Sequence, residues 1–331
     1  ELKGVAATIP NQRILLSALA LLEAKESSAV ENIITTHDEL FKSGAFPSVG
    51  RVSPAAKEVR RYAHALQRGY DRVRETGVLT NRYILEIQAA IEQNTAGFRK
   101  LPGTVLKDGA GRTIFTPPQD PALVLDLMGD LEGFINDDER FRTDPLVKMA
   151  VLHHQFESIH PFYDGNGRTG RIINVLYLVR RSLLDIPVLY LSRHIVRTKG
   201  DYYRLLQAVR ERGAWEEWVL YVLKAVEMTS GETINTIGEI REALMAYKHE
   251  IRERYHFYSQ DLVNSLFHHP YTRIEYLVRD LKVTRKTAAK YLDQLAKDGL
   301  LDKHKFGRSN YYINRALVRI LIGEDDHGVT G

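Results

Sequence analysis

Twelve consecutive residues, 160 to 171, hold the side chains of this chain that are best suited to chemistry. They read His-Pro-Phe-Tyr-Asp-Gly-Asn-Gly-Arg-Thr-Gly-Arg, and an apolar helical pattern follows at once. A glycine-rich loop that leads into a helix points several backbone N–H groups, and the positive end of the helix dipole, at one place. The sequence therefore predicts a site for an anion, with phosphate as the first candidate.

Four side chains of this stretch suit phosphate transfer. His160 could accept the proton of an attacking hydroxyl group. Asp164 is a hard oxygen ligand of the kind that a magnesium ion carried by phosphates prefers. Arg168 and Arg171 lie about one helical turn apart, so both can hold phosphates at one site and neutralise a leaving group. These residues predict attack on a nucleotide phosphate.

The residues between these side chains predict a close approach of the main chain. Gly165 and Gly167 have no Cβ, so the backbone there can contact a phosphate or adopt positive φ. Asn166 also tolerates the left-handed region and can donate from its amide. A single Gly-Asn-Gly is most often only a turn, and the flanking charges are what favour a phosphate site here.

A metal-hydrolase site is an alternative for the residues just before the loop. His153, His154, Glu157 and His160 lie at helical spacing and could be metal ligands. However, the HExxH pattern is absent, and Pro161 ends the helix that His160 would need. We expect His153, His154 and Glu157 to pack or hydrogen-bond inside the domain.

The stretch resembles the signature of Fic-domain proteins, His-x-Phe-x-(Asp/Glu)-Gly-Asn-Gly-Arg-x-x-Arg, and it meets every fixed position. The resemblance implies transfer of AMP from ATP to a Ser, Thr or Tyr hydroxyl of a protein, with release of pyrophosphate. It implies His160 as the base and Asp164 as the Mg²⁺ ligand. The residues that it assigns to ATP are Asp164, Gly165, Asn166, Gly167, Arg168, Thr169, Gly170 and Arg171.

A second resemblance lies near the N-terminus, where Ser27-x-x-x-Glu31-Asn32 is similar to the family's inhibitory motif, (Ser/Thr)-x-x-x-Glu-(Gly/Asn). It implies that a short helix places Glu31 against Arg171 and blocks the productive seat of the γ-phosphate. The alternative is structural. Ser28 as a helix N-cap, with Glu31 three residues on, would form a capping box.

A hairpin signature runs from residue 103 to residue 115. Two strand-like runs, 103–106 and 112–115, flank a Lys-Asp-Gly-Ala-Gly turn. An exposed hairpin edge can pair with an extended target segment. Resemblance to the family implies a flap that holds the target chain beside the catalytic histidine, and the alternative is a surface hairpin without a role. The flap residues are Thr113, Ile114, Phe115 and Thr116.

Two tyrosines open the helix that begins near Gly200. Family resemblance implies that a tyrosine here walls the adenine pocket, with Tyr203 as the first choice and Tyr202 as the second. Plain helix packing is the alternative for either. Trp215 and Trp218, in the following helix, are expected to be core anchors.

The C-terminal part has a different sequence pattern. A long charged helix pattern from 231 to about 255 indicates a connector. Helices over 272–281 and 285–295, a turn between them and a two-strand wing around 306–309 resemble the winged-helix DNA-binding family. Eight Lys or Arg stand against three Asp between 282 and 308, as phosphate contacts require. The expected contacts are Arg285, Lys286, Lys290 and Arg308; the alternative is protein contact or dimerisation.

Composition limits the remaining options. The chain has 331 residues, 44% of them hydrophobic, a net charge of +4 and no cysteine. The lack of cysteine excludes disulfides and thiolate metal sites, which suits a reducing cytoplasm. No apolar run reaches membrane-spanning length. We therefore expect a cytoplasmic protein without a membrane segment.

We expect a mainly α fold, with a Fic helical core, a small β-hairpin flap and a C-terminal winged helix-turn-helix domain. The expected segments are 1–45, arm and inhibitory helix; 46–230, catalytic core; 231–254, connector; and 255–331, winged helix. The expected function is a protein adenylyltransferase that also modifies itself, uses ATP and Mg²⁺, and is inhibited by Glu31. The alternatives are a DNA-binding transcription regulator with a nucleotide-sensing core, or a protein de-AMPylase. A homodimer also stays open.

Overall fold

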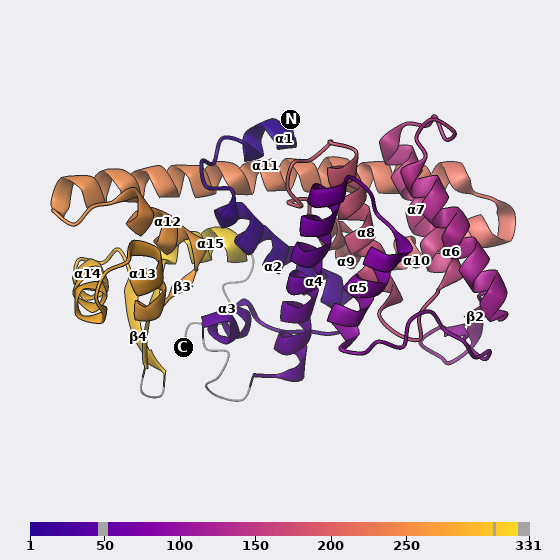
Figure 1. Ribbon diagram of the computed structural model, residues 1–331, viewed down its shortest axis with the longest axis horizontal. Coiled ribbons are helices and arrows are strands. Elements are labelled where there is room, and N and C mark those ends of the chain that lie inside the picture. The colour runs from indigo at the N-terminus through magenta and orange to yellow at the C-terminus, as the bar shows by residue number, and fades with distance from the viewer. Residues whose placement is uncertain (46–51, 307–308, 324–331) are drawn as a thin grey trace. The chain divides into compact units, whose positions relative to one another are not determined.

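The computed structural model describes residues 1–45, 52–306 and 309–323. The described chain is mostly helical, with two small antiparallel sheets (Figure 1), so the mainly α prediction is confirmed. The residues group into two compact units. We call 23–33 with 61–230 the motif unit, and 1–22, 34–60 and 231–331 the terminal unit.

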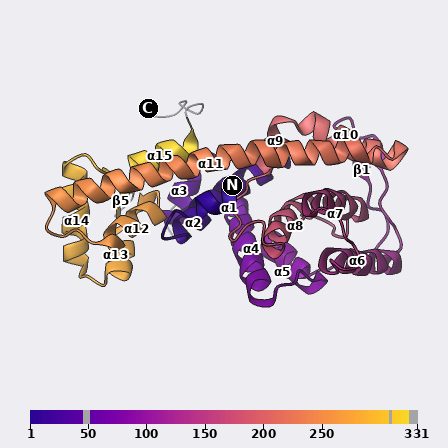
Figure 2. The same cartoon turned by 90° about the horizontal axis from the view of Figure 1, so that it is seen from above.

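The motif unit is built around α8, which is buried over nearly all of its length. Helix α8 packs against both α7 and α5, and α6 packs against α7 (Figure 2). The apolar residues of α8 from Ile172 to Leu178 need such a covering. The helices that lie in this unit, wholly or in part, are α2 (Arg13–Val30), α4 (Pro54–Thr76), α5 (Asn81–Glu92), α6 (Pro121–Asn136), α7 (Pro145–Ile159), α8 (Asn166–Arg180), α9 (Ser192–Arg197), α10 (Lys199–Arg212) and α11 (Trp215–Arg254).

Local sequence signals fix both ends of α7. The Asp144 carboxylate accepts from the backbone N–H groups of Leu146 and Val147, and Pro145 occupies the first turn, where its missing N–H costs nothing. His160 ends the helix in the left-handed conformation. Helix α7 therefore runs from Pro145 to Ile159, and residues 160–165 form the loop that leads into α8.

The hairpin is present but shorter than its sequence pattern indicates. Strand β1 (Leu106–Lys107) pairs with β2 (Thr113–Phe115), and the register shifts within the pair. The glycine with positive φ is Gly111 rather than Gly109, because the Asp108 side chain accepts from the N–H groups of Ala110 and Arg112 and so closes a longer loop.

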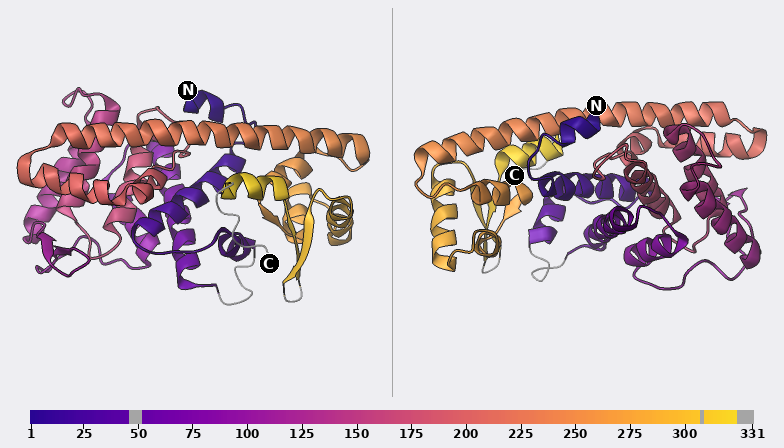
Figure 3. Two further views of the ribbon diagram at one scale, coloured as in Figure 1. Left: turned by 180° about the vertical axis from the view of Figure 1, so that it is seen from behind. Right: turned by 45° about the horizontal axis from the view of Figure 1, so that its top comes forward.

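The C-terminal part of the terminal unit contains two helices, a capped turn and a hairpin in the predicted order. Thr284 accepts from the N–H of Thr287 and caps α14. The strands form a three-stranded antiparallel sheet in the order β3-β5-β4, and its hairpin extends from the neighbouring helices (Figure 3). The elements are α12 (Gln260–His268), β3 (Tyr271–Thr272), α13 (Ile274–Leu281), α14 (Arg285–Lys297), β4 (Asp302–Phe306), β5 (Ser309–Ile313) and α15 (Arg315–Ile322).

The N-terminal segments of the same unit differ from the expected arm. Helix α1 (Leu2–Ala6) buries Leu2 and Ala6. Helix α3 (His37–Ala45) packs on β3, where Asp38 accepts a 2.7 Å hydrogen bond from Tyr271. The predicted helix over 272–281 therefore begins two residues late, since Thr272 belongs to the β3 strand that α3 covers.

Helix α11 is one uninterrupted helix of 40 residues, as both views of Figure 3 show. The predicted connector is only its second half, because Gly231 does not break the helix. No helix in residues 1–45, 52–306 or 309–323 combines the length and the apolar character needed to cross a membrane.

Candidate functional site

The loop between α7 and α8 is closed by the side chain of Asn166. Its amide oxygen accepts from the N–H of Phe162 at 2.9 Å, and its amide nitrogen donates to the carbonyl of the same residue at 2.8 Å. Asn166 is 3% exposed. The side chain of Asn166 therefore holds the loop, and its assignment to ATP stays a prediction.

The glycines of the loop let two carboxylates come close. Gly165 has φ +79°, and a Cβ on it would lie 2.6 Å from Oε1 of Glu92. A Cβ on Gly167 would collide with the Glu31 carboxylate and lie 2.9 Å from Nη1 of Arg171. The first N–H groups of a helix have no partner within the helix, so acceptors gather at this end of α8.

Arg171 is 1% exposed and is held by the end of α2. Its Nε donates to Oγ of Ser27 at 2.7 Å, and its Nη2 donates to the Ser27 carbonyl at 2.9 Å and to Oε1 of Glu31 at 2.8 Å. Burial alone would raise the pKa of Glu31, but Arg171, Arg168 and Lys199 outweigh it and lower the pKa. Glu31 therefore stays ionised at neutral pH.

The backbone of α2 explains the spacing of the Ser27-to-Asn32 pattern. Helix α2 ends at Val30, and Asn32 follows with φ 62°, a conformation that favours Gly or Asn. The capping-box alternative is wrong, because Ser28 lies inside α2 rather than at a helix start, and its hydroxyl makes no hydrogen bond within the described residues.

Arg168 has a carboxylate partner that the sequence did not indicate. Its Nη2 lies 2.7 Å from Oε1 of Glu92 and 3.7 Å from Oδ1 of Asp164, and its side chain is 4% exposed. Glu92 is the last residue of α5, and no motif marks it in the sequence. The pair forms because α5 packs against α8, and the sequence alone does not indicate that packing.

His160 lies at the junction of α7 and the loop, with φ 49°. Burial lowers the pKa of His160 to about 4, and the charges of Arg99 and Arg210 act in the same direction. The imidazole is therefore neutral at neutral pH and can accept a proton. Arg99, a second residue that the sequence analysis missed, donates to the His160 main-chain carbonyl at 2.9 Å.

Asp164 fits a role as a single metal ligand. Its side chain is 78% exposed, and Oδ1 accepts from the N–H of Gly165 at 2.7 Å. Within the described ranges, no three His, Asp or Glu side chains form a cluster that could hold a metal ion. A magnesium ion that arrives on phosphates needs only one or two protein carboxylates, so the residues present are compatible with such an ion.

Thr169 and Gly170 face the protein interior. Thr169 is 0% exposed, and a Cβ on Gly170 would lie 2.8 Å from Oε1 of Glu157 and 3.0 Å from the Phe156 ring. Gly170 thus lets α8 approach α7. Packing accounts for both residues, and their assignment to ATP stays a prediction.

The residues of the metal-hydrolase alternative are packed inside the unit, as expected. His153 bonds to Oη of Tyr202 at 2.9 Å, and His154 bonds to the carbonyl of Leu206 at 3.2 Å. Burial lowers the pKa of His153 to about 3 and that of His154 to about 4. Burial raises the pKa of Glu157 to about 7.

The two tyrosines of α10 have different surroundings. Tyr202 is 2% exposed, and its ring lies against Trp218, so packing rather than a ligand accounts for it. Tyr203 is 41% exposed and remains the candidate for the adenine pocket. Trp218 is fully buried, whereas Trp215 is 39% exposed, so only Trp218 is the expected core anchor.

Helix α10 supports the flap strand. Gln207 donates to the Ile114 carbonyl at 3.1 Å, and the Arg210 guanidinium lies 3.9 Å from the centre of the Phe115 ring. Ile114 is 41% exposed, and Thr113 is exposed as well. Thr116 follows the strand. The hairpin therefore has one supported side and one side open to solvent.

The basic residues predicted to contact DNA lie at the start of α14. Arg285, Lys286 and Lys290 are all exposed. Arg285 forms a 2.6 Å ion pair with Glu275, so part of its charge is neutralised. Arg308 lies outside the described residues.

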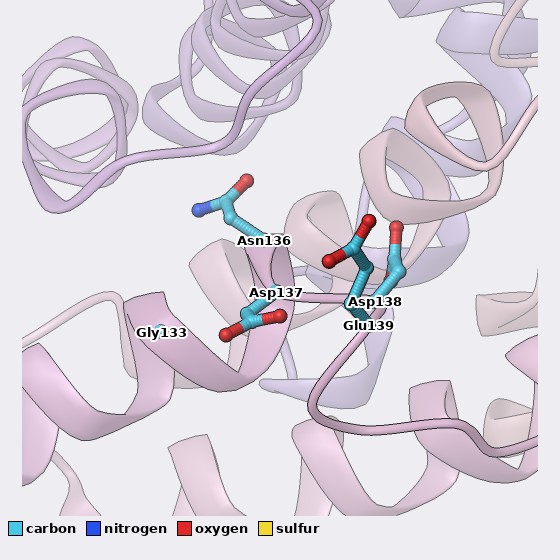
Figure 4. Close-up of a pocket in the computed structure, with 5 residues that line it drawn as sticks. All are labelled: Gly133, Asn136, Asp137, Asp138 and Glu139. Atoms are coloured by element: carbon cyan, nitrogen blue, oxygen red, sulfur yellow. The ribbon is translucent and has the colours of Figure 1, made fainter.

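A separate pocket of about 500 Å³ lies where α6 ends, lined by Gly133, Asn136, Asp137, Asp138 and Glu139. No predicted site residue lines it. Figure 4 shows the Asp137 carboxylate pointing away from that of Asp138. Asp138 forms ion pairs with Lys148, Arg180 and Arg181, so its charge serves the packing of α7 and α8.

Family models match three separate stretches of the chain. Residues 1–71 match the Fic/DOC family N-terminal model, and residues 78–178 match the Fic/DOC family model. Residues 244–317 match the C-terminal domain of SoFic-like protein adenylyltransferases. The second match contains all of the 160–171 loop and helix start.

Named relatives match part of the chain. It is 33% identical over 132 residues to protein adenylyltransferase fic-1 of Caenorhabditis briggsae, covering 37% of this chain and 24% of the relative. It is 38% identical over 72 residues to a probable protein adenylyltransferase of Aquifex aeolicus, covering 22% of each. The chain thus spans about a quarter or less of the length of these relatives.

Solved structures share the fold. A Fic family protein from Desulfovibrio desulfuricans superposes with a TM-score of 0.58 at 20% identity, covering 93% of this chain and 89% of the other. A fragment of Fic-1 from Caenorhabditis elegans gives 0.53 at 24% identity, covering 71% and 68%. The Fic/DOC family N-terminal and Fic/DOC family models together match more than half of the chain, and the complete motif at residues 160–171 lies in the second match, so the chain belongs to the Fic/DOC family.

Proposed function

We propose that this chain is a protein adenylyltransferase, which transfers AMP from ATP to a Ser, Thr or Tyr hydroxyl of a protein, its own hydroxyls included, and releases pyrophosphate. The observation that carries the proposal is the junction of α7 and α8. There a neutral imidazole, the amide end of a buried helix and two buried arginines lie within twelve residues of sequence. The names of the relatives support the same activity.

His160 has the protonation state that a general base needs. The neutral imidazole takes the proton of the target hydroxyl as its oxygen attacks the α-phosphorus, and the bond from that phosphorus to the bridging oxygen breaks. The electron pair of that bond leaves with pyrophosphate. A bound polyanion raises the pKa of a nearby imidazole, so ATP would strengthen this weak base.

The phosphates would be held by the first turn of α8 and by the two motif arginines. Backbone N–H groups at a helix start suit a phosphate, and guanidinium groups bind its oxygens in pairs. Arg168 now pairs with Glu92, and Arg171 pairs with Glu31. Binding of ATP would exchange these carboxylates for phosphate oxygens. A Mg²⁺ ion held by Asp164 would neutralise phosphate charge.

We propose that Glu31 inhibits the reaction. It is ionised, it bonds to Arg171, and it lies against Gly167, where a phosphate would have to approach the main chain. Two negative charges cannot share this place without a large repulsion. Ser27 and Asn32 support the inhibition, since Ser27 binds Arg171 and Asn32 lets the chain turn after α2.

We propose roles for the surrounding segments along the boundaries expected from the sequence. Residues 1–45 carry the inhibitory segment, 46–230 the catalytic core, 231–254 the connector and 255–331 a winged-helix domain. Tyr203 would wall the adenine pocket, and residues 113–116 would hold the target chain by strand pairing. A cytoplasmic location remains the prediction from the absence of cysteine.

Two alternatives have their own observations. Exposed Arg285 and Lys286 at the start of α14 favour a role in DNA binding, which would make the chain a transcription regulator with a nucleotide-sensing core. A carboxylate beside the anion site favours de-AMPylation, in which Glu31 would position a water for attack on modified protein. Protein contact or dimerisation through the winged helix also stays a prediction.

The transfer itself can be tested with α-labelled ATP. Purified chain with ATP and magnesium should take up label, and mass spectrometry should show the gain of one AMP on a hydroxyl residue. His160→Ala should lower the rate by roughly 10² to 10⁴-fold, as loss of a general base does. Full transfer by His160→Ala contradicts the base assignment. Release of AMP from modified protein, without uptake, would favour the reverse reaction.

A further inference from the structure

Arg99 precedes the β1–β2 hairpin and contacts the loop that joins α7 to α8. It belongs to no recognised motif. It is 2% exposed. Its Nε donates to the His160 carbonyl at 2.9 Å, and its Nη2 donates to the Ile159 carbonyl at 3.3 Å and to the Pro118 carbonyl. Its own N–H donates to the Pro161 carbonyl at 2.8 Å. One residue thus bonds to three successive carbonyls, those of Ile159, His160 and Pro161.

The neighbours of Arg99 hold the same loop. The rings of Phe98 and Phe162 lie 5.3 Å apart, and the Tyr163 hydroxyl accepts from the N–H groups of Lys100 and Leu101 at 2.8 and 3.0 Å. This brace, residues 98–101, leads directly into the hairpin. The chain that leaves the hairpin passes through Pro118, to which Arg99 donates. Arg99 therefore belongs to the segment that enters the flap and binds the segment that leaves it. We call these two segments the roots of the flap.

The charge of Arg99 is used in an unusual way. A buried guanidinium is normally paired with a carboxylate. In the described residues no carboxylate pairs with Arg99, and its guanidinium donates to the main-chain carbonyls of His160, Pro118 and Ile159. A planar fork of donors can fix several carbonyls at once. His160 has a left-handed backbone with φ 49°, which is strained in a residue other than glycine, so hydrogen bonds that fix its main chain would help to keep it in place.

We propose that Arg99 is a positioning residue for AMP transfer, which fixes the main chain of His160 to both roots of the flap. The inference rests on the proposed function. The base and the flap that would hold the target hydroxyl then share one rigid frame. The residue acts after ATP has bound, on the alignment of hydroxyl and imidazole, and a misplacement of about 1 Å can cost roughly 10²-fold in rate.

The test compares Arg99→Lys and Arg99→Met in the full chain, in a Glu31→Gly background, with Arg82→Lys as the control. Arg82 is 73% exposed. The measurements are kcat for AMP transfer, the Kd for ATP, and the pH dependence of the rate. Arg99→Lys keeps the charge but loses the fork, so kcat should fall by roughly 10²-fold, whereas the Kd for ATP should change by less than about twofold. The control should match its parent.

Arg99→Met gives a second, independent readout. The charge of Arg99 lowers the pKa of His160, so its loss should raise that pKa and move the acid limb of the rate profile to higher pH. The proposal is overturned if ATP affinity and thermal stability fall in step with kcat, which is the pattern of a merely structural role. Unchanged kcat in Arg99→Lys overturns it as well, even if Arg99→Met does not fold.

Failure of the proposed function is recognised separately. If the Glu31→Gly parent transfers no AMP, adenylyl transfer is wrong, but the position of His160 can still be measured. NMR titration of the His160 imidazole needs no activity. Arg99→Lys should change its chemical shifts, and Arg99→Met should raise its pKa, whereas unchanged signals in both variants overturn the role of Arg99.

Discussion

At the scale of single residues, one arginine sets the charge of the carboxyl groups around it. Arg171 lowers the pKa of Glu31, to which it bonds directly, and only partly offsets the burial of Glu23 and Glu157, whose pKa values are raised to about 7. The Arg171 guanidinium pairs closely with Glu31 only. Glu23 and Glu157 are buried without such a close pairing, so their protonated forms are favoured.

Glu157 should therefore make stability depend on pH. An acid whose pKa is raised by folding favours the native state when it is protonated, so the free energy of unfolding should fall as pH rises from about 4.5 to about 7. Glu157→Gln removes this ionisation. Its melting temperature should exceed that of the parent near pH 8, and the difference should shrink near pH 5.

The exposed Glu216 provides the control, because its replacement by Gln should leave the difference from the parent constant over the same range. If the difference in melting temperature between Glu157→Gln and the parent is the same at every pH, burial of this carboxyl has no effect on the pH dependence of stability.

At the scale of elements, the end of one helix positions the carboxylate that pairs with Arg171. Helix α2 stops at Val30, and the left-handed Asn32 turns the chain away, so Glu31 projects from the last turn toward Arg171. The carboxylate is thus positioned by a helix terminus and not by a flexible loop. Every partner of Arg171 named above comes from residues 27–31, so this segment would act as a unit in the proposed inhibition.

Removal of Glu31 should raise activity. Glu31→Gly clears the place beside Gly167 and frees Arg171 for phosphate, and we expect self-modification to rise by at least about tenfold, which corresponds to only ~1.4 kcal/mol. The measurement is the initial rate of label uptake from α-labelled ATP. Asn32→Gly is the control, because it keeps the left-handed turn and should stay as slow as the parent. An equal or slower rate in Glu31→Gly contradicts the inhibitory role.

At the scale of the whole molecule, each compact unit is assembled from separate stretches of chain. Residues 23–33 belong to the motif unit, although the stretches on either side belong to the terminal unit. Within the terminal unit, Arg273 donates to the Ala45 carbonyl at 2.6 Å across more than two hundred residues of sequence. Truncation after residue 250 would therefore remove packing partners of α3 and would not isolate one function.

Charge substitution on α14 separates the two functions more cleanly. Lys286→Ala with Lys290→Ala should leave the rate of AMP transfer within about twofold of the parent. If α14 binds DNA, the same variant should bind more weakly, and the slope of log affinity against log salt should fall by about 1.8, or 0.9 for each lost phosphate contact. The measurement is DNA binding by fluorescence anisotropy at several salt concentrations.

The matched control is Lys224→Ala, which changes an exposed lysine of α11. No binding of the parent to DNA would contradict the role of α14 in DNA recognition. Loss of transfer in the double variant would instead tie the terminal unit to catalysis.

The sequence by itself determined the elements whose signals are local. Asp144-Pro145 begins α7, the glycines open α8, and Thr284 caps α14, because capping and backbone freedom act over a few residues. The twelve-residue motif likewise placed a histidine, a glycine-rich helix start and two arginines together, since residues close in sequence at the start of a helix stay close in space.

Only the tertiary structure decided which distant groups complete the site. Glu92 on Arg168 and Arg99 on His160 come from residues more than sixty positions away, and no local pattern distinguishes them from other charged residues. It also decided that Tyr202, Thr169 and the Asn166 amide face inward. Burial and pairing depend on how helices pack against one another, and propensity along the chain carries no information about that packing.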